Sequence, residues 1–360
     1  MGGNRQFQRR RAAWGRLGGS VMLSASVLLG GGGCGPSFPP PWQLSAEPSD
    51  AGGQLDLDGK LRVLAIASEP PEVRPGQSVK VSSLIVVHPR FGEVTLDGGR
   101  SFGTLRPRGL SVLYRLCTLP EAMTSPLPCG LFPQTAQYTE LPTRSDFSTE
   151  ILIPNQLGSP SVQLVTLIAA DHSYPGGAQA CAVAAADNGG LSPSPNHCVI
   201  AVKRIKVSTT TAPNHNPVLT KILLGETEGT LVDAESGVAT YPKLSAELRE
   251  EDRPKWQVVI ERAADSEEQE PDPLDPGRQR AELLSVSLFV TAGTLESGRG
   301  SFLDLTCTSD CPQLLRSTLS WQPPAALAGT EAADDRTHFV VVLRDDRGGT
   351  SFRAAVAEAR

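Results

Sequence analysis

The sequence predicts an all-β protein with two β-sandwich domains in tandem, placed after a signal peptide and a flexible tether. The 35 glycines and 30 prolines among 360 residues are typical of many short strands joined by turns. Short runs of alternating apolar and polar residues recur from residue 61 to the C-terminus. Seven cysteines leave an even six once Cys34 is set apart, which favours disulfides in an exported chain.

Residues 1–33 have the three parts of a secretory signal. Five arginines come first, an apolar core over 21–29 follows, and small residues lead to Cys34. The apolar core has about 10 residues, whereas a membrane-spanning helix needs about 20. We therefore expect a cleaved signal and exclude this segment from the fold.

The cysteine after the small residues makes this signal more specific. Gly32, Gly33 and Cys34 resemble the cleavage site of bacterial lipoproteins, in which the cysteine after the cut carries the lipid. The resemblance implies lipidation of Cys34. Gly35 stands where an aspartate is associated with retention in the inner membrane, so the resemblance also implies the outer membrane. The alternative is an ordinary signal cut elsewhere, which would leave Cys34 as a free thiol.

The charge balance limits the partners. Without residues 1–33, 28 basic residues face 39 acidic ones, a net charge of −11. Nucleic acid is excluded as a partner because phosphate contacts need Lys and Arg. Anionic lipid is disfavoured for the same reason, so membrane attachment is expected to be covalent, through several acyl chains on Cys34.

Residues 34–59 are rich in proline and glycine and predict an extended tether. Asp56, Asp58 and Gly59 superficially resemble part of a calcium loop, but the remaining ligands of that loop are missing. We expect a turn that leads into the first strand.

The first domain is predicted over 60–207. Two alternating runs, 61–67 and 79–86, flank the turn sequence PPEVRPG, which excludes helix. Strand, proline-rich turn and strand is how many immunoglobulin-like domains begin, and this resemblance is to the architecture alone. Further strands are expected at 111–117, 148–153, 162–169, 178–185 and 198–207.

A polar linker at 208–216 precedes the second predicted immunoglobulin-like sandwich, 217–360. Its strands are expected at 218–224, 243–248, 256–261, 283–290, 301–306, 317–321, 338–343 and 351–357. The last two form a hairpin around the turn DDRGG, whose glycines supply positive φ. Trp256 and Trp321 are core candidates. The acidic, proline-rich segment 264–282 is expected to project as an unfolded loop, with calcium binding as the alternative.

The six remaining cysteines cluster as three local pairs. We predict the disulfides Cys117–Cys129, Cys181–Cys198 and Cys307–Cys311. The second is expected to join the last two strands of the first domain. A zinc site is the rival interpretation, but the spacing of Cys307 and Cys311 lacks a second nearby ligand pair.

The sequence contains no recognised catalytic motif, and we predict no enzyme activity, cofactor or metal. The five histidines (His88, His172, His197, His215 and His338) are scattered and are expected on the surface or in loops. The run Asp171-His172-Ser173 suggests a triad only superficially, because adjacent strand residues point to opposite faces.

Four stretches together resemble predicted lipoproteins of myxobacterial type with tandem immunoglobulin-like domains. They are the start up to Cys34, VLAIASEPPEVRPGQSV, NHNPVLTKI and FVVVLRDDRGGTSF. The resemblance implies a non-enzymatic structural, adhesive or binding role in the cell envelope, toward an unidentified envelope protein or glycan. The alternative is an envelope enzyme that acts on carbohydrate or peptide through an unrecognised site. A third hypothesis is calcium-dependent adhesion through the acidic loops.

Overall fold

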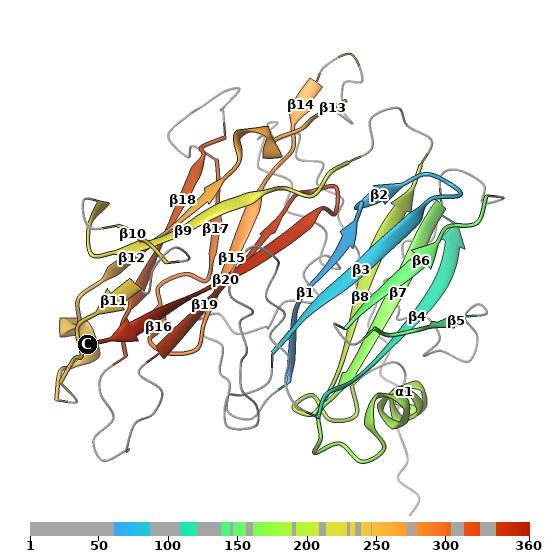
Figure 1. Cartoon of the computed structure of the whole chain (residues 1–360), viewed down its shortest axis with the longest axis horizontal. Helices are drawn as coiled ribbons and strands as arrows, with labels where there is room; N and C mark the ends of the chain where they lie inside the picture. Colours follow the sequence, from blue (N-terminus) through green and yellow to red (C-terminus); the bar gives the residue numbers. More distant parts are fainter. Residues whose placement is uncertain are drawn as a thin grey trace, which may run out of the picture. The chain divides into compact units, whose positions relative to one another are not determined.

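The fold was analysed in a computed structural model, which describes residues 61–86, 109–120, 138–144, 147–155, 161–188, 192–208, 214–228, 231–234, 239–245, 247–271, 277, 279–303, 313–324 and 336–360. These all belong to one compact unit, Pro39–Arg360. The predicted signal peptide, Cys34 and the tether lie outside the described residues. Most residues of the described part lie in strands, with one α-helix, which confirms the all-β prediction (Figure 1).

Two sheets form the first sandwich. The three-stranded sheet has the order β1-β3-β6 and the five-stranded sheet the order β2-β8-β7-β4-β5. The bounds are β1 Arg62–Glu69, β2 Glu72–Val73, β3 Ser78–Val86, β4 Ser111–Pro120, β5 Thr139–Leu141, β6 Ser148–Leu152, β7 Ser161–Ala170 and β8 Cys198–Val207. Apolar side chains from both sheets, such as Val81, Ile151 and Leu167, fill the space between them.

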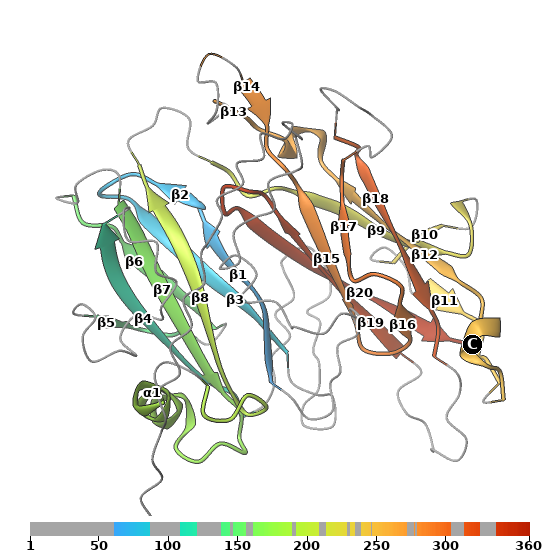
Figure 2. The same cartoon turned by 180° about the vertical axis from the view of Figure 1, so that it is seen from behind.

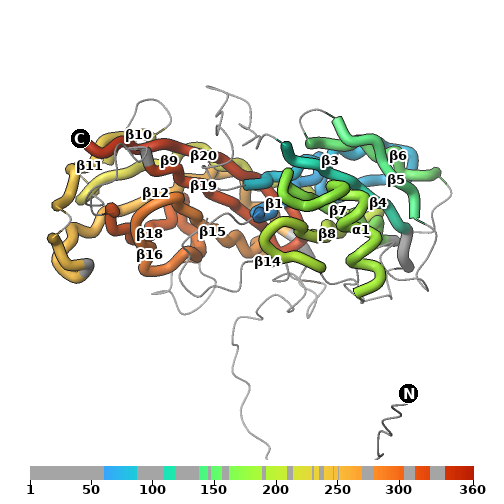
Figure 3. The backbone as a smooth tube through the Cα atoms, turned by 90° about the horizontal axis from the view of Figure 1, so that it is seen from below, coloured from blue at the N-terminus to red at the C-terminus, as the bar shows by residue number. Residues whose placement is uncertain are grey.

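The helix α1, Gly177–Asp187, corrects the strand predicted at 178–185. Its sequence, GAQACAVAAAD, is rich in alanine, the residue with the highest helix propensity. Its buried residues, Ala178, Cys181, Ala182 and Ala185, follow the spacing i, i+3, i+4, i+7 of one helix face. That face packs on β7 and β4 at one end of the first sandwich (Figure 2 and Figure 3).

Two five-stranded sheets form the second sandwich, in the orders β10-β9-β12-β18-β16 and β11-β20-β19-β15-β17. The bounds are β9 Leu219–Gly225, β10 Val232–Asp233, β11 Ala239–Tyr241, β12 Trp256–Arg262, β15 Ser285–Val290, β16 Thr294–Leu295, β17 Arg299–Ser301, β18 Arg316–Gln322, β19 Arg336–Arg344 and β20 Thr350–Ala359. The strand predicted at 243–248 is wrong, because the edge strand β11 ends before it.

The core of the second sandwich confirms both tryptophan predictions. Trp321 is fully buried and Trp256 nearly so, with ring centroids 6.4 Å apart. Tyr241 and Phe339 complete the cluster, each edge-on to Trp321. Gly293 permits this packing: it has φ +83°, and an added Cβ would lie only 2.4 Å from the indole Nε1 of Trp321.

The described residues of the segment 264–282 (264–271, 277 and 279–282) include regular structure, which corrects the prediction of an unfolded loop for this part. One 3₁₀ turn, Glu250–Asp252, precedes β12, and a second, Ala264–Ser266, follows it. The chain then forms the antiparallel pair β13 Gln269–Pro271 and β14 Gln279–Ala281. The residues flanking the pair bond to each other, since Glu282 N donates to Glu268 O at 3.0 Å. Both side chains also contact Arg347 of the β19–β20 turn. The polar composition therefore led to a wrong prediction for this part of the chain, because it does not reveal that Glu268 and Glu282 contact Arg347.

An apolar cluster joins the two sandwiches. Leu64, Ala65, Leu84 and Val86 of the first pack with Phe289, Val340, Val342 and Phe352 of the second. Along β19 the alternation assigns Phe339, Val341 and Leu343 to the sandwich core and the residues between them to this cluster. Both faces of β19 are thus buried. Each buried Val, Leu or Phe contributes about 1.5–3 kcal/mol, so this contact is more than a loose linker.

Candidate functional site

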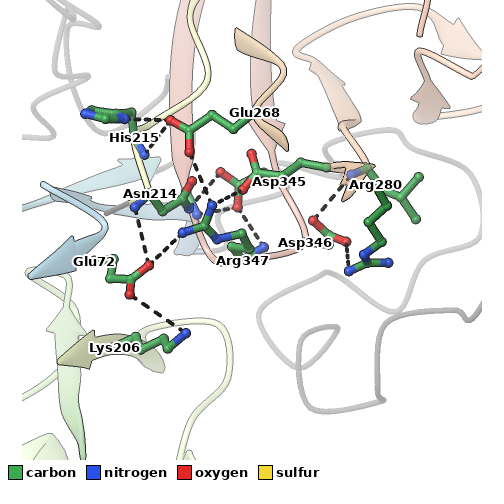
Figure 4. Close-up of polar contacts among 12 residues, drawn as sticks. Glu72, Lys206, Asn214, His215, Glu268, Arg280, Asp345, Asp346 and Arg347 are labelled. Atoms are coloured by element: carbon green, nitrogen blue, oxygen red, sulfur yellow. Dashed lines mark hydrogen bonds and ion pairs between the residues drawn. The ribbon is translucent and has the colours of Figure 1, made fainter. Parts of the chain in front are cut away.

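The best-defined polar site is a group of charged residues beside the apolar cluster, which we call the joint. It consists of Glu72 and Lys203 of the first sandwich, Asn214 of the linker, and Glu268, Glu282, Asp345 and Arg347 of the second. Figure 4 shows most of these side chains converging on Arg347. No motif in the sequence marks this site.

The β19–β20 turn positions Arg347. The carboxylate Oδ1 of Asp345 accepts hydrogen bonds from the backbone N of Arg347 at 2.9 Å and of Gly349 at 2.7 Å. Gly349 is required, because an added Cβ would lie 2.0 Å from the other oxygen of Asp345. Gly348 has φ +101°, a conformation that glycine adopts without strain. The DDRGG sequence thus builds a turn that directs Arg347 toward Glu72 of the first sandwich.

Arg347 bridges carboxylates of both sandwiches. Its Nη2 donates to Oε2 of Glu72 at 2.8 Å, across the joint. Its Nη1 lies 3.2 Å from Oε2 of Glu268 and 2.9 Å from Oε1 of Glu282. The side chains of Glu72 and Glu282 are 3 % and 1 % exposed. One guanidinium therefore serves three carboxylates, two of them buried.

Two asparagines of the linker complete the bridge. Asn214 donates from its backbone N to Glu72 at 3.3 Å and from Nδ2 to Asp345 at 3.1 Å. Asn216 donates to the carbonyl of Ser68 at 2.7 Å and accepts from the backbone N of Thr350 at 2.8 Å. The end of the linker thus bonds to both sandwiches.

Two cations cross the joint to backbone carbonyls. Lys203 of β8 donates from Nζ to the carbonyl of Gly348 at 2.5 Å and to Oγ1 of Thr350 at 3.3 Å. Arg344 of β19 donates from Nη2 to the carbonyl of Leu64 at 2.9 Å. In the first bond the donor belongs to the first sandwich, and in the second bond it belongs to the second, with a carbonyl of β1 as the acceptor. Both sandwiches therefore contribute donors and acceptors.

Burial shifts several pKa values in the joint. Burial and the nearby Asp345 together raise the pKa of Glu282 to about 8, against the opposing effect of Arg347. Burial likewise raises the pKa of Asp345 and lowers the pKa of Lys203 to about 8. For Glu72, hydrogen bonds from Ser208 and Arg347 outweigh burial, and its pKa is lowered. The joint therefore holds one carboxyl that is mostly protonated at neutral pH.

These shifts predict a stability minimum near pH 8. The pKa of Glu282 is higher in the folded state than its ordinary 4.5, so its contribution to stability declines as pH rises from about 4.5 to about 8. The pKa of Lys203 is lower in the folded state than its ordinary 10.5, so its contribution declines as pH falls from about 10.5 to about 8. Urea unfolding across pH 5–10 measures the profile. A stability that rises steadily through pH 8 would contradict it.

The predicted site residues are only partly described. Cys181 and Cys198 form the predicted disulfide, with Cα atoms 5.9 Å apart, but it joins helix α1 to strand β8 and not two strands. Cys117 is also disulfide-bonded, and its predicted partner Cys129 lies outside the described residues. It lies within β4 and does not end that strand. Cys34, Cys307 and Cys311 lie outside the described residues as well.

The Asp171-His172-Ser173 run is not arranged as a triad, although Nε2 of His172 lies 3.5 Å from Oγ of Ser173. Oδ2 of Asp171 lies 2.9 Å from Nδ1 of His197, and its Oδ1 accepts the backbone N of Ser173 at 2.8 Å. Within the described part of the chain, His197 has no hydrogen bond at its second ring nitrogen, where a nucleophile would have to lie. We interpret Asp171 as the residue that fixes this turn.

Two further features bear on ligands. Among the described residues no group of three His, Cys, Asp or Glu side chains is placed to hold a metal ion. Glu268 and Glu282, acids of the segment considered for calcium, face Arg347. A hollow of about 420 Å³ opens at β9–β12, lined among others by Val232 and Trp256. Its described lining has one titratable side chain, Glu226, which is too few for an acid–base pair.

Comparisons with known proteins add little. No family model matches the chain, and no curated protein matches it. A solved structure, dimeric latent PorU from Porphyromonas gingivalis, matches with a TM-score of 0.20 and 9 % identity. The match covers 84 % of this chain and 24 % of that one, so the chain spans about a quarter of that protein. A likeness at this level carries no functional argument. No helix in the described ranges has the length and apolar character to cross a membrane.

Proposed function

We propose that this chain is an exported, lipid-anchored protein of the cell envelope, attached to the outer membrane through Cys34. In this proposal it is not an enzyme. Its two sandwiches form a structural, adhesive or binding module directed at an envelope protein or glycan. Export is supported by the signal-like start and by the fully buried Cys181–Cys198 disulfide, since such bonds persist in oxidising compartments.

The joint is the observation that carries the proposal. Arg347 belongs to one sandwich and its shortest carboxylate contact, Glu72 at 2.8 Å, to the other, so this ion pair links the two domains. Burying such a pair favours one arrangement of the sandwiches. A fixed pair of sandwiches behind a tether suits a spacer or a presenting scaffold, whose loops and sheet edges would supply the binding surface.

Intact mass and detergent partitioning test the anchor. The full chain is expressed in a bacterium that processes lipoproteins, beside Cys34→Ala. We expect the wild type to lack residues 1–33, to carry a diacylglyceryl-type mass increase and to enter the detergent phase. Cys34→Ala should stay unlipidated in the aqueous phase. A wild type that is soluble and unlipidated would contradict the proposed anchor.

Capture from envelope extract tests the binding role. The wild type serves as bait beside Arg347→Met, which keeps the loops of both sandwiches but removes the cation of the joint. We expect a protein or glycan partner that the wild type retains and the variant retains less. Recovery of no partner by either bait would count against a binding role.

A further inference from the structure

Glu282 lies in the joint without a matching counter-charge. It is fully buried, and within the described residues neither of its carboxylate oxygens has a hydrogen-bond partner of acceptable geometry. Its Oε1 is 2.9 Å from Arg347, but that guanidinium also holds Glu72 and Glu268. Asp345, Glu268 and Asp346 all repel an ionised Glu282.

The other charged side chains in and around the joint already have partners. Lys206 lies 3.8 Å from Glu72, Arg280 lies 2.9 Å from Asp346, and His215 lies 2.6 Å from Glu268. Lys203 faces Asp345 and, with opposite effect, Arg344. Protonation of Glu282 removes one of the three negative charges that Arg347 must balance. Loss of that proton adds a buried charge that the joint cannot fully balance.

We propose that Glu282 is a proton-operated switch for the joint. With Glu282 protonated, the two sandwiches are held together through Arg347. When Glu282 ionises, repulsion from its acidic neighbours pushes the Glu282 backbone and the β19–β20 turn apart, and Arg347 releases Glu72. The inference deepens the proposed function, because it adds a regulation to the same joint and rests on that joint being closed at lower pH.

Burial of the side chain supports the direction of the switch. The pKa of Glu282, about 8, places the change of charge in the mildly alkaline range. The turn that would move is short and carries Asp345, which must also stay buried for Arg347 to keep its position. Opening therefore exposes several charges together.

Amide hydrogen exchange on the full chain reads the state of the joint directly. The backbone amides of Asn214, His215 and Thr350 donate to side chains of the joint and of the linker (Glu72, Glu268 and Asn216). After correction for intrinsic rates, we expect protection of these amides to fall about tenfold or more between about pH 6 and about pH 9. In Glu282→Gln, which cannot ionise, protection should change little.

Controls separate the possible outcomes. Glu261→Gln removes a carboxylate that pairs with Arg316 outside the joint, and it should respond to pH as the wild type does. Glu282→Leu serves if the glutamine variant does not fold. Equal protection at both pH values in the wild type, or the same loss in Glu282→Gln, would overturn the switch and in the second case implicate Asp345, whose pKa is also raised. Amides unprotected already at pH 6 would overturn the closed joint itself, and with it the fixed-module proposal.

Discussion

Replacing Arg347 by methionine is expected to destabilise the folded protein by about 3–5 kcal/mol at pH 7, the cost of removing one partner of a buried ion pair. Methionine keeps much of the side-chain volume but leaves Glu72, 3 % exposed, without its closest cation. Glu282 is largely protonated at this pH, so Glu72 carries most of the penalty. Urea unfolding followed by circular dichroism measures the loss.

Arg316→Met is the matched control for that substitution. Arg316 also pairs with two carboxylates, Glu261 at 2.6 Å and Glu228 at 3.3 Å, but its side chain is 51 % exposed. Exposed pairs contribute only about 0.2–1 kcal/mol. Losses of similar size in the two variants would show that Arg347 behaves as an ordinary surface arginine, contrary to this account.

Replacing Trp321 by alanine is expected to cost about 3–5 kcal/mol, the range for removing a large aromatic side chain from a core. Trp321 is fully buried, with ring centroids 4.9 Å from Phe339 and 5.2 Å from Tyr241. Its Nε1 also donates to the carbonyl of Ala292 at 3.0 Å. The loss is expected to be independent of pH between 5 and 9, because no titratable group contributes to it.

A pair of phenylalanine substitutions isolates the hydrogen bond of Trp321. Trp321→Phe leaves the carbonyl of Ala292 unpaired, whereas the indole Nε1 of Trp256 has no partner among the described residues. Trp256→Phe therefore loses no hydrogen bond, and we expect it to be the milder change by about 1–2 kcal/mol. Thermal unfolding of both variants decides this, and a milder Trp321→Phe would contradict the assignment.

Strand positions were predictable from the sequence where apolar and polar residues alternate, so that one face of the strand is buried and the other exposed. Alternating runs and turn residues predicted most strands and the β19–β20 hairpin correctly. The helix α1 was predicted as a strand, because residues 178–185 are small and apolar and show no clear helical period in the sequence. Their high alanine content nevertheless favours a helix. Glu268 and Glu282 contact Arg347, and these tertiary contacts could not be read from the local composition, which predicted a loop.

The joint was not predictable from local patterns. Arg347 and Glu72 are 275 residues apart, and one sequence gives no sign of their pairing. One signal was present: FVVVL in β19 is a continuous apolar run, which indicates a strand buried on both faces. From this run one could have inferred that the outer face of the sheet packs against another part of the protein, but not which part.

Scanning calorimetry of the full chain near pH 6 tests the central claim, that the two sandwiches behave as one module because of the joint. We expect one transition for the wild type, with equal calorimetric and van't Hoff enthalpies, since unfolding either sandwich exposes charges of the other. Arg347→Met should bring the van't Hoff enthalpy below the calorimetric one, because the apolar cluster alone couples the two sandwiches less tightly. Two independent transitions already in the wild type would contradict the account, because each sandwich would then be stable without the joint.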